Sequence, residues 1–218
     1  MVLSVNPIDF ILHVDEYIGI FIASYGMFTY GILFLIILLE TGLVVTPFLP
    51  GDSLLFVAGA FAAQGKISIW ILFILLAIAA IIGDSINYFM GNYFGERFFI
   101  KRGLIKADYI ERTKEFFKRH GGKTIIYARF VPIVRTFAPF VAGVGKMEYS
   151  RFLLFNIGGG ISWIALFLSA GYFFGEITWV KEHLTEVIFL IIFISIMPPI
   201  IGYVHDKMQR TVKREIPK

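Results

Sequence analysis

The chain has 218 residues, of which 57% are hydrophobic and only 17% are charged, and its mean hydropathy is +0.77. Soluble domains average about one quarter charged residues, so this composition predicts an integral membrane protein with one domain. The lack of cysteine excludes disulfides, thiolate metal sites and cysteine nucleophiles. The net charge of +4 is small and does not suggest nucleic-acid binding.

The N-terminal segment, residues 1–24, is predicted to lie at the membrane interface. Within it, residues 8–22 mix apolar side chains with acidic ones, a pattern typical of an amphipathic interfacial helix. No basic region precedes the first apolar stretch, so we expect no cleavable signal peptide.

The membrane domain is predicted to cover residues 25–204 and to be all-α. About 20 helical residues at about 1.5 Å per residue cross the ~30 Å hydrocarbon core of a bilayer. We therefore expect about four transmembrane helices, with residues 175–183 as a short interfacial link before the last one. The four apolar stretches are residues 25–46, 67–94, 150–174 and 184–204.

Two further apolar segments, residues 47–64 and 124–145, are interrupted by prolines and glycines, among them Pro50 and Pro132. Such interruptions leave backbone groups without partners in lipid, which disfavours a straight crossing helix. Both segments also contain Phe-x-Pro followed within ten residues by Phe-Val-Ala-Gly. Matched broken segments are typical of inverted-repeat transporters, so we predict two opposed re-entrant helical hairpins.

Basic residues set the expected orientation. Residues 97–123 contain nine Lys or Arg, and the tail at 205–218 is also basic. Short basic loops stay in the cytoplasm, and the scattered aromatic residues of 97–123 place this loop on the membrane surface. Four spans and two hairpins then put both termini in the cytoplasm. If residues 47–64 crossed the bilayer outright, the N-terminus would lie outside instead.

Two acidic residues fall in or beside the first broken segment. Glu40 lies within the span 25–46, where a carboxylate costs several kcal/mol unless it is paired or solvated. It is therefore either a structural or membrane-end charge, or a proton- or cation-responsive group that lines a cavity. Asp52 follows Pro50 and Gly51, where it can cap the second arm of the hairpin, and helix ends inside a membrane are also ligand sites.

The second broken segment carries basic residues instead. Arg129 and Arg135 flank Pro132, and the planar guanidinium fork suits phosphate. Arg129 has the alternative of reaching the cytoplasmic interface, but Arg135 lies deeper in the hairpin. We expect these arginines to bind a lipid headgroup phosphate, to pair with Glu40 and Asp52, or both.

Two further polar residues, Asp84 and Asn156, lie within the predicted spans. Asp84 lies in the span 67–94, where hydrogen bonding to a hairpin end and a role in transport are equally compatible with its position. Asn156 lies in the span 150–174 and can serve as a polar contact between helices. Both are predicted to support the site, as are Pro50 and Pro132.

These motifs together resemble the DedA family of bacterial inner-membrane proteins, from about residue 25 to residue 200. The first part of the resemblance consists of Glu40, residues 48–55 (Phe-Leu-Pro-Gly-Asp-Ser-Leu-Leu) and Gly83-Asp84-x-x-x-Tyr88. The second part consists of Arg129-Phe130-x-Pro132-x-x-Arg135-x-x-x-Pro139-x-x-Ala142-Gly143 and Asn156-x-x-Gly159-x-x-x-Trp163.

The resemblance implies a domain with two opposed re-entrant hairpins, shared with eukaryotic VTT-domain lipid scramblases. It also implies flippase-type lipid transport at the inner membrane, such as return of undecaprenyl phosphate or a phospholipid to the cytoplasmic leaflet, in dependence on the proton motive force. The family's important charged residues correspond to Glu40, Asp52, Arg129 and Arg135. The lipid that this chain moves does not follow from the resemblance.

Other classes of function compete with lipid transport. A proton-dependent antiporter of small cations or drugs would use the same carboxylates, and an assembly protein would need the charges only for its fold. A lipid phosphatase is disfavoured, because it needs a histidine nucleophile near basic residues and no histidine lies in either broken segment. We therefore expect no enzyme, metal or cofactor.

The expected partners are membrane lipids, a lipid phosphate headgroup, and protons or monovalent cations, but not nucleic acid. Self-association into a homo-oligomer stays open at the sequence level. Small residues at Gly91 and Gly95 and at 158–160 form faces that can pack against another helix of the same chain or of a second chain.

Overall fold

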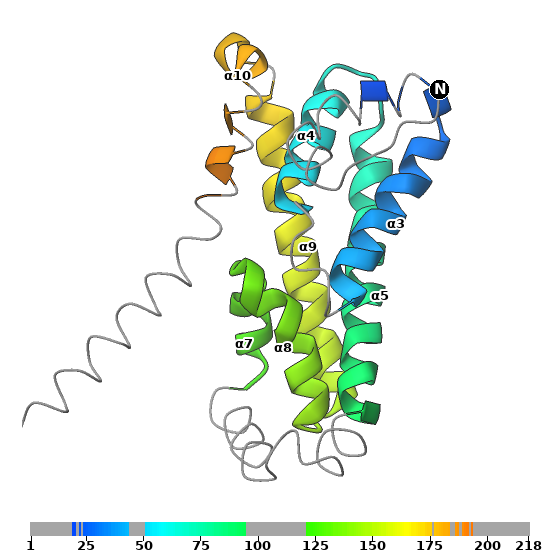
Figure 1. The fold of residues 1–218 in the computed structure, drawn as a ribbon, viewed down its shortest axis with the longest axis vertical. Coiled ribbons are helices and arrows are strands. Elements are labelled where there is room, and N and C mark those ends of the chain that lie inside the picture. Colours follow the sequence, from blue (N-terminus) through cyan, green and yellow to red (C-terminus); the bar gives the residue numbers. More distant parts are fainter. Residues whose placement is uncertain are drawn as a thin grey trace, which may run out of the picture.

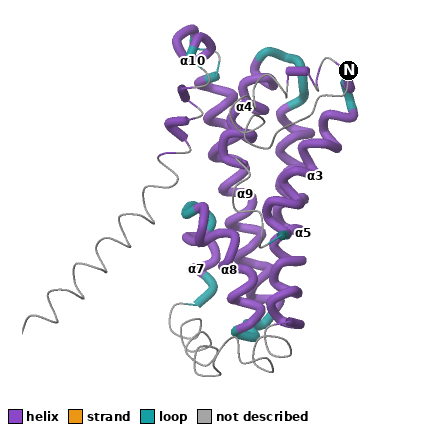
Figure 2. The backbone as a smooth tube through the Cα atoms, viewed as in Figure 1, coloured by secondary structure: helices purple, strands orange, loops and turns teal. Residues whose placement is uncertain are grey.

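A computed structural model describes most of the predicted membrane domain. Its described residues are 19–43 (without 21 and 23), 51–94, 121–175, 177–183, 186, 187, 189–191 and 193. All regular structure in this part of the chain is helical (Figure 2). Most of the predicted N-terminal helix, of the basic loop 97–123 and of the last predicted span, and all of the C-terminal tail, lie outside the described residues. The helices are α3 (Phe28–Gly42), α4 (Gly51–Ala63), α5 (Ile69–Phe94), α7 (Lys123–Ala128), α8 (Pro132–Val144), α9 (Tyr149–Phe174) and α10 (Thr178–Glu182).

Two long helices, α5 and α9, form the centre of the fold and pack against each other (Figure 1). Each has 26 residues and is apolar enough to cross a membrane. At about 1.5 Å per residue their length is about 39 Å, more than the ~30 Å hydrocarbon core. These helices match the predicted spans 67–94 and 150–174. The shorter α3 lies along α5 and falls within the predicted span 25–46.

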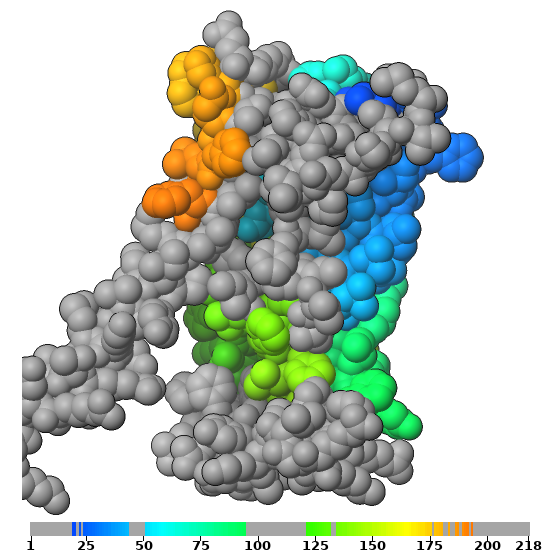
Figure 3. Space-filling model, in the orientation of Figure 1, coloured from blue at the N-terminus to red at the C-terminus, as the bar shows by residue number. Residues whose placement is uncertain are grey.

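The outer surface of α5 is apolar along its length. Ile71, Ile74, Ile78, Ile82 and Ile86 recur every three or four residues, and each is at least 43% exposed. That spacing puts them on one face of the helix. In the space-filling view, α3 and the lower part of α5 together form a continuous outer face (Figure 3). Such an apolar stripe is unfavourable in water and suits lipid.

Two short helices each cover one half of the long pair. Helix α4 packs against α9, and α8 packs against α5. In Figure 1, α4 occupies one half of the length of the molecule and α7 with α8 occupies the other, and the chain runs through α4 and α8 in opposite directions. The breaks at the start of α4 and between α7 and α8 both lie near the middle of the long helices.

The second broken segment folds as a helix, a turn and a helix. Helix α7 ends at Ala128, and α8 starts with Pro132 in its first turn. The preceding residue, Val131, is extended (φ −119°, ψ 103°), as expected for a residue before proline. Of the first broken segment, 47–64, the structure describes the second arm, which is α4, whereas residues 44–50 lie outside the described part.

The internal repeat in the sequence reappears as a repeated helix contact. At the first copy, α4 meets α9 so closely that a Cβ on Gly59 would collide with the backbone oxygen of Leu168. In turn, a Cβ on Gly171 would collide with the backbone oxygen of Phe56. Only glycine permits two helix backbones to approach in this way.

The second copy makes the same contact between α8 and α5. A Cβ on Gly143 would collide with the backbone oxygen of Tyr88, and one on Gly91 would collide with that of Phe140. The spacing of three residues between glycine and contacting carbonyl is the same in all four helices. Each Phe-Val-Ala-Gly motif is therefore a docking surface for a long helix. At Gly91, the small-residue face serves packing within the chain.

We predict that Gly91→Ala destabilises the protein by about 1–3 kcal/mol, because the added methyl group meets the α8 backbone and neither helix can yield without moving. Thermal unfolding of the purified protein in detergent measures this. The matched control is Gly31→Ala on α3, where an added Cβ has nothing within 4 Å. Equal melting temperatures for the two variants would contradict the proposed close contact.

Candidate functional site

Three charged side chains from three helices meet where the short helices begin. Arg135 on α8 places Nη1 2.5 Å from Asp52 Oδ1 on α4 and Nη2 2.5 Å from Glu40 Oε1 on α3. The exposed fractions of these side chains are 11% for Arg135, 11% for Asp52 and 3% for Glu40. One buried guanidinium thus joins two carboxylates that are far apart in the sequence.

The start of α4 is shaped for this arrangement. A Cβ at Gly51 would collide with the Glu40 carboxylate, so the glycine allows Glu40 to reach the helix end. Asp52 lies in the first turn of α4, where the helix dipole stabilises a negative charge. Gly51 therefore lets two carboxylates approach the same arginine at the start of α4.

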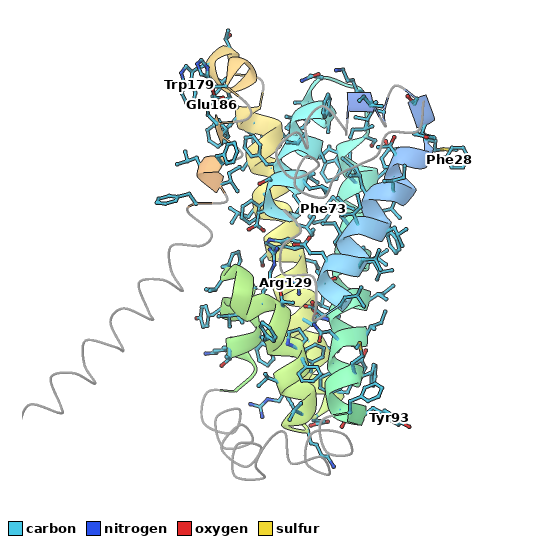
Figure 4. All side chains as sticks on the ribbon, viewed as in Figure 1. Phe28, Phe73, Tyr93, Arg129, Trp179 and Glu186 are labelled. Atoms are coloured by element: carbon cyan, nitrogen blue, oxygen red, sulfur yellow. The ribbon has the colours of Figure 1, made fainter. Side chains whose placement is uncertain are left out.

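Arg129 forms a second ion pair close to the first. Its Nη1 lies 2.7 Å from Asp84 Oδ2 on α5 and donates a hydrogen bond to Asn156 Oδ1 on α9, also at 2.7 Å. Asn156 in turn donates to the backbone oxygen of Ile81 at 3.0 Å. Arg129 is 4% exposed and lies midway between Phe28 and Trp179 at one end and Tyr93 at the other (Figure 4).

This second pair corrects one expectation from the sequence. Of the alternatives that the sequence leaves open for Arg129, a lipid phosphate or pairing with Glu40 and Asp52, the second does not hold. Arg129 pairs with Asp84, because it lies in the turn before α8 and faces α5 and α9. Small residues on α9 make the room: Cβ atoms on Gly159 and Gly160 would lie 3.4 Å from Arg129 Cδ and 3.5 Å from its Nη1. These glycines therefore face a side chain of their own chain.

Trp163 on α9 connects the two pairs, and its side chain is fully buried. Its Nε1–H donates to Asp52 Oδ1 at 2.8 Å. The Arg135 and Arg129 guanidinium carbons lie 4.6 Å and 5.6 Å from the centre of a Trp163 ring, within the range of cation–π attraction. Sequence reasoning gave Trp163 no separate role. The available signal was its place in the middle of a span, since Trp in membrane proteins concentrates at the interfaces.

Asn87 is a second residue that sequence reasoning missed. It is fully buried on α5, and its Nδ2 donates to the backbone oxygens of Thr41 at 3.2 Å and Thr136 at 2.8 Å. It therefore ties the ends of α3 and α8 to α5. Its spacing of three residues from Asp84, which puts both on one helix face, was the signal that could have identified it.

A small cavity lies within this cluster. Its volume is about 10 Å³, room for about one water molecule and far too little for a phosphate headgroup. Among its lining residues are Glu40, Thr41, Asp84, Arg135 and Thr136. With Asp52 included, three carboxylates face two guanidiniums, so the fully ionised cluster has one negative charge in excess. Among the described residues, no three His, Cys, Asp or Glu side chains are arranged so that they could hold a metal ion.

The structure thus gathers six of the residues singled out in the sequence. They are Glu40, Asp52, Asp84, Arg129, Arg135 and Asn156. Pro132 begins the helix that carries Arg135, whereas Pro50 lies outside the described residues. This arrangement can hold a displaceable anion on Arg135 and can store a proton on its excess carboxylate.

We predict that Asp84→Ala destabilises the protein by about 3–5 kcal/mol, because it leaves Arg129 buried without a counter-charge. The double variant Asp84→Ala/Arg129→Leu should regain part of that loss, since it removes the unpaired charge as well. Unfolding in denaturant measures both, with the exposed Asn92→Ala on the same helix as control. Additive effects of the two substitutions would show that the ion pair has no energetic role.

Comparisons with known proteins agree with this architecture. The VTT domain family matches residues 49–173, which cover the second broken segment and α5 completely and all but one or two residues of the first broken segment and of α9. Protein DedA of Escherichia coli (strain K12) is 51% identical over 92% of this chain and 93% of its own length. An uncharacterized membrane protein of Mycobacterium leprae is 42% identical over 83% of each chain, and inner membrane protein YghB of Escherichia coli (strain K12) is 36% identical over 78% of this chain and 77% of its own. No solved structure matches. The chain is a membrane protein that belongs to the DedA family of VTT-domain proteins.

Proposed function

We propose that this protein moves a phosphate-bearing lipid, such as undecaprenyl phosphate or a phospholipid, between the leaflets of the membrane. The observation that carries the proposal is Arg135, a buried guanidinium fork held between two carboxylates at the meeting point of α3, α4 and α8. Arginine binds phosphate oxygens with the same bidentate geometry that it uses for carboxylates. Glu40 and Asp52 therefore occupy Arg135 as a lipid phosphate would.

The proposal includes a topology of four spans and two opposed re-entrant hairpins, with both termini in the cytoplasm. Helices α4 and α8 have 13 residues each, or about 20 Å at about 1.5 Å per residue, which is too short to cross the ~30 Å core. Each packs on half of a long helix, and both breaks lie near the middle. The basic segments at 97–123 and 205–218 favour the cytoplasmic side for both.

The arrangement corresponds to a closed state in the proposed cycle. The cavity holds about one water molecule, so a headgroup enters only when the helices around Arg135 separate. Binding then replaces two internal carboxylates by one external phosphate. Alternate opening toward the two leaflets would carry the headgroup across, while the lipid tail stays in the bilayer.

The excess carboxylate also favours a second candidate, a proton-dependent antiporter of small cations or drugs. Such a protein would need Glu40, Asp52 or Asp84 to hold a cation, and Arg135 would be only a counter-charge. The two candidates differ in what happens when the guanidinium fork is lost but its charge remains, as in Arg135→Lys. A lipid transporter loses recognition of phosphate, whereas an antiporter keeps its carboxylates and their counter-charge.

We predict that the purified protein in liposomes moves a fluorescent polyprenyl phosphate or phospholipid across the bilayer. Arg135→Ala should slow this movement more than about tenfold, since charge-assisted hydrogen bonds contribute about 1.5–3 kcal/mol each. The measurement is the rate at which the labelled headgroup becomes accessible to a membrane-impermeant quencher, with and without a pH gradient.

Two further variants make this measurement specific. Arg135→Lys, which keeps the charge but loses the fork, should lie between wild type and Arg135→Ala. Arg151→Ala, which removes an exposed arginine at the start of α9, should move lipid at the wild-type rate. Two results would rule out the proposed function. One is transport by Arg135→Ala at the wild-type rate, and the other is no lipid movement by the wild type either with or without a pH gradient.

A further inference from the structure

We propose that the two carboxylates on Arg135 behave differently when a phosphate arrives: Glu40 takes up one proton, while Asp52 stays ionised because Trp163 holds it. The lipid phosphate and one proton would then bind together and move in the same direction. This inference rests on the proposed function above and adds to it the direction of proton coupling and the residues responsible.

Asp52 keeps partners after Arg135 leaves it. The Trp163 Nε1–H donates to Asp52 Oδ1, the same oxygen that Arg135 contacts, at 2.8 Å. Asp52 also lies in the first turn of α4, where the helix dipole favours a negative charge. A buried carboxylate with a hydrogen-bond donor and a helix N-terminus can remain ionised without a cation.

Glu40 has less support: its carboxylate also lies against Gly51 at the start of α4, but no indole or other side-chain donor besides Arg135 contacts it among the described residues. Its Oε1 contacts Arg135, and its Oε2 is buried and accepts no hydrogen bond from the described residues. It lies in the last turn of α3, whose dipole disfavours a negative charge and so opposes the favourable dipole of α4. Once Arg135 turns to a phosphate, a charged Glu40 would be buried without a counter-charge, which is costly. A proton on Oε2 removes that cost.

The surrounding charges favour the same outcome. Asp84 from α5 is neutralised by Arg129 from the turn before α8, while α9 contributes only the uncharged Asn156 and Trp163 to the cluster. Glu40 and Asp52 share the remaining cation, Arg135. A phosphate adds negative charge to a cluster that already has an excess, so its binding and the uptake of a proton reinforce each other. The cavity beside Glu40 has room for about one water molecule to deliver it.

Uptake of a proton together with the phosphate makes phosphate binding depend on pH. If one proton binds with each phosphate, the apparent affinity falls about tenfold for each unit rise in pH, because the number of protons taken up sets the slope. Release of a proton, as in antiport, would give the opposite slope. The slope therefore reports both the direction and the number of coupled protons.

The test measures binding of farnesyl phosphate, a short polyprenyl monophosphate, to the full-length protein in detergent between about pH 7.5 and 9, where a free phosphate monoester is a dianion because its second pKa is about 6. Substitution of the exposed Trp70 and Trp179 by Phe leaves Trp163 as the only tryptophan, and its emission reports binding. In a plot of the logarithm of the apparent affinity against pH, we expect a slope that corresponds to one proton for this background and for the matched variant Asp52→Asn. For Glu40→Gln we expect the affinity to be independent of pH.

Trp163 has its own readout. In Trp163→Phe, where calorimetry replaces fluorescence, the indole donor to Asp52 is lost and an apolar aromatic side chain remains. Asp52 then needs a proton as well, so the slope should rise toward two. If Trp163 has only a structural role, Trp163→Phe would lower stability or affinity but leave the slope at one proton. That result would overturn the proposal that Trp163 keeps Asp52 ionised.

The remaining outcomes separate this inference from the function on which it rests. Binding of farnesyl phosphate to the wild type without net proton uptake, measured directly with a pH indicator in weak buffer, overturns the inference and leaves lipid transport standing. A slope that persists in Glu40→Gln overturns the assignment to Glu40. No binding at all overturns the proposed function. Binding of inorganic phosphate as tight as that of farnesyl phosphate would make free phosphate, not a lipid, the ligand.

Discussion

The structure depends on one buried guanidinium that must satisfy two carboxylates at once. Arg135 joins the end of α3 and the start of α4 to α8, three elements from distant parts of the sequence. In a low-dielectric interior such an arrangement is not a strong source of stability, since the desolvation of three charges offsets much of their attraction. In the function proposed here its value lies in exchange, because an anion that fits the guanidinium fork would replace the carboxylates.

The repeated glycine contacts explain how the protein can hold this cluster in lipid. Helix α4 docks on α9 through Gly59 and Gly171, and α8 docks on α5 in the same way. Helix ends leave backbone groups without partners, and the fold places charged side chains near the starts of α4 and α8. The Arg129–Asp84 pair and Trp163 complete the cluster from the long helices, and Trp163 connects Arg135 to α9 through their shared partner Asp52.

Much of this could be read from the sequence because lipid imposes strict rules. Long apolar stretches predicted α5 and α9, and charges within apolar segments identified Glu40, Asp52, Arg129 and Arg135. The pairing could not be read, because it depends on which faces of the helices meet: Arg129 takes Asp84, and Arg135 takes both other carboxylates. Trp163 and Asn87 were missed because an aromatic or an amide in a span has a structural explanation that sequence alone does not exclude.

The central claim is that a lipid phosphate takes the place of Glu40 and Asp52 on Arg135. The most direct measurement is a structure of the protein with a polyprenyl phosphate bound in a lipid nanodisc. The account predicts phosphate oxygens within hydrogen-bond distance of both Arg135 Nη atoms, Glu40 turned away, and Asp52 still bound to the Trp163 indole. A lipid phosphate bound elsewhere, with Arg135 still paired to both carboxylates, would contradict it.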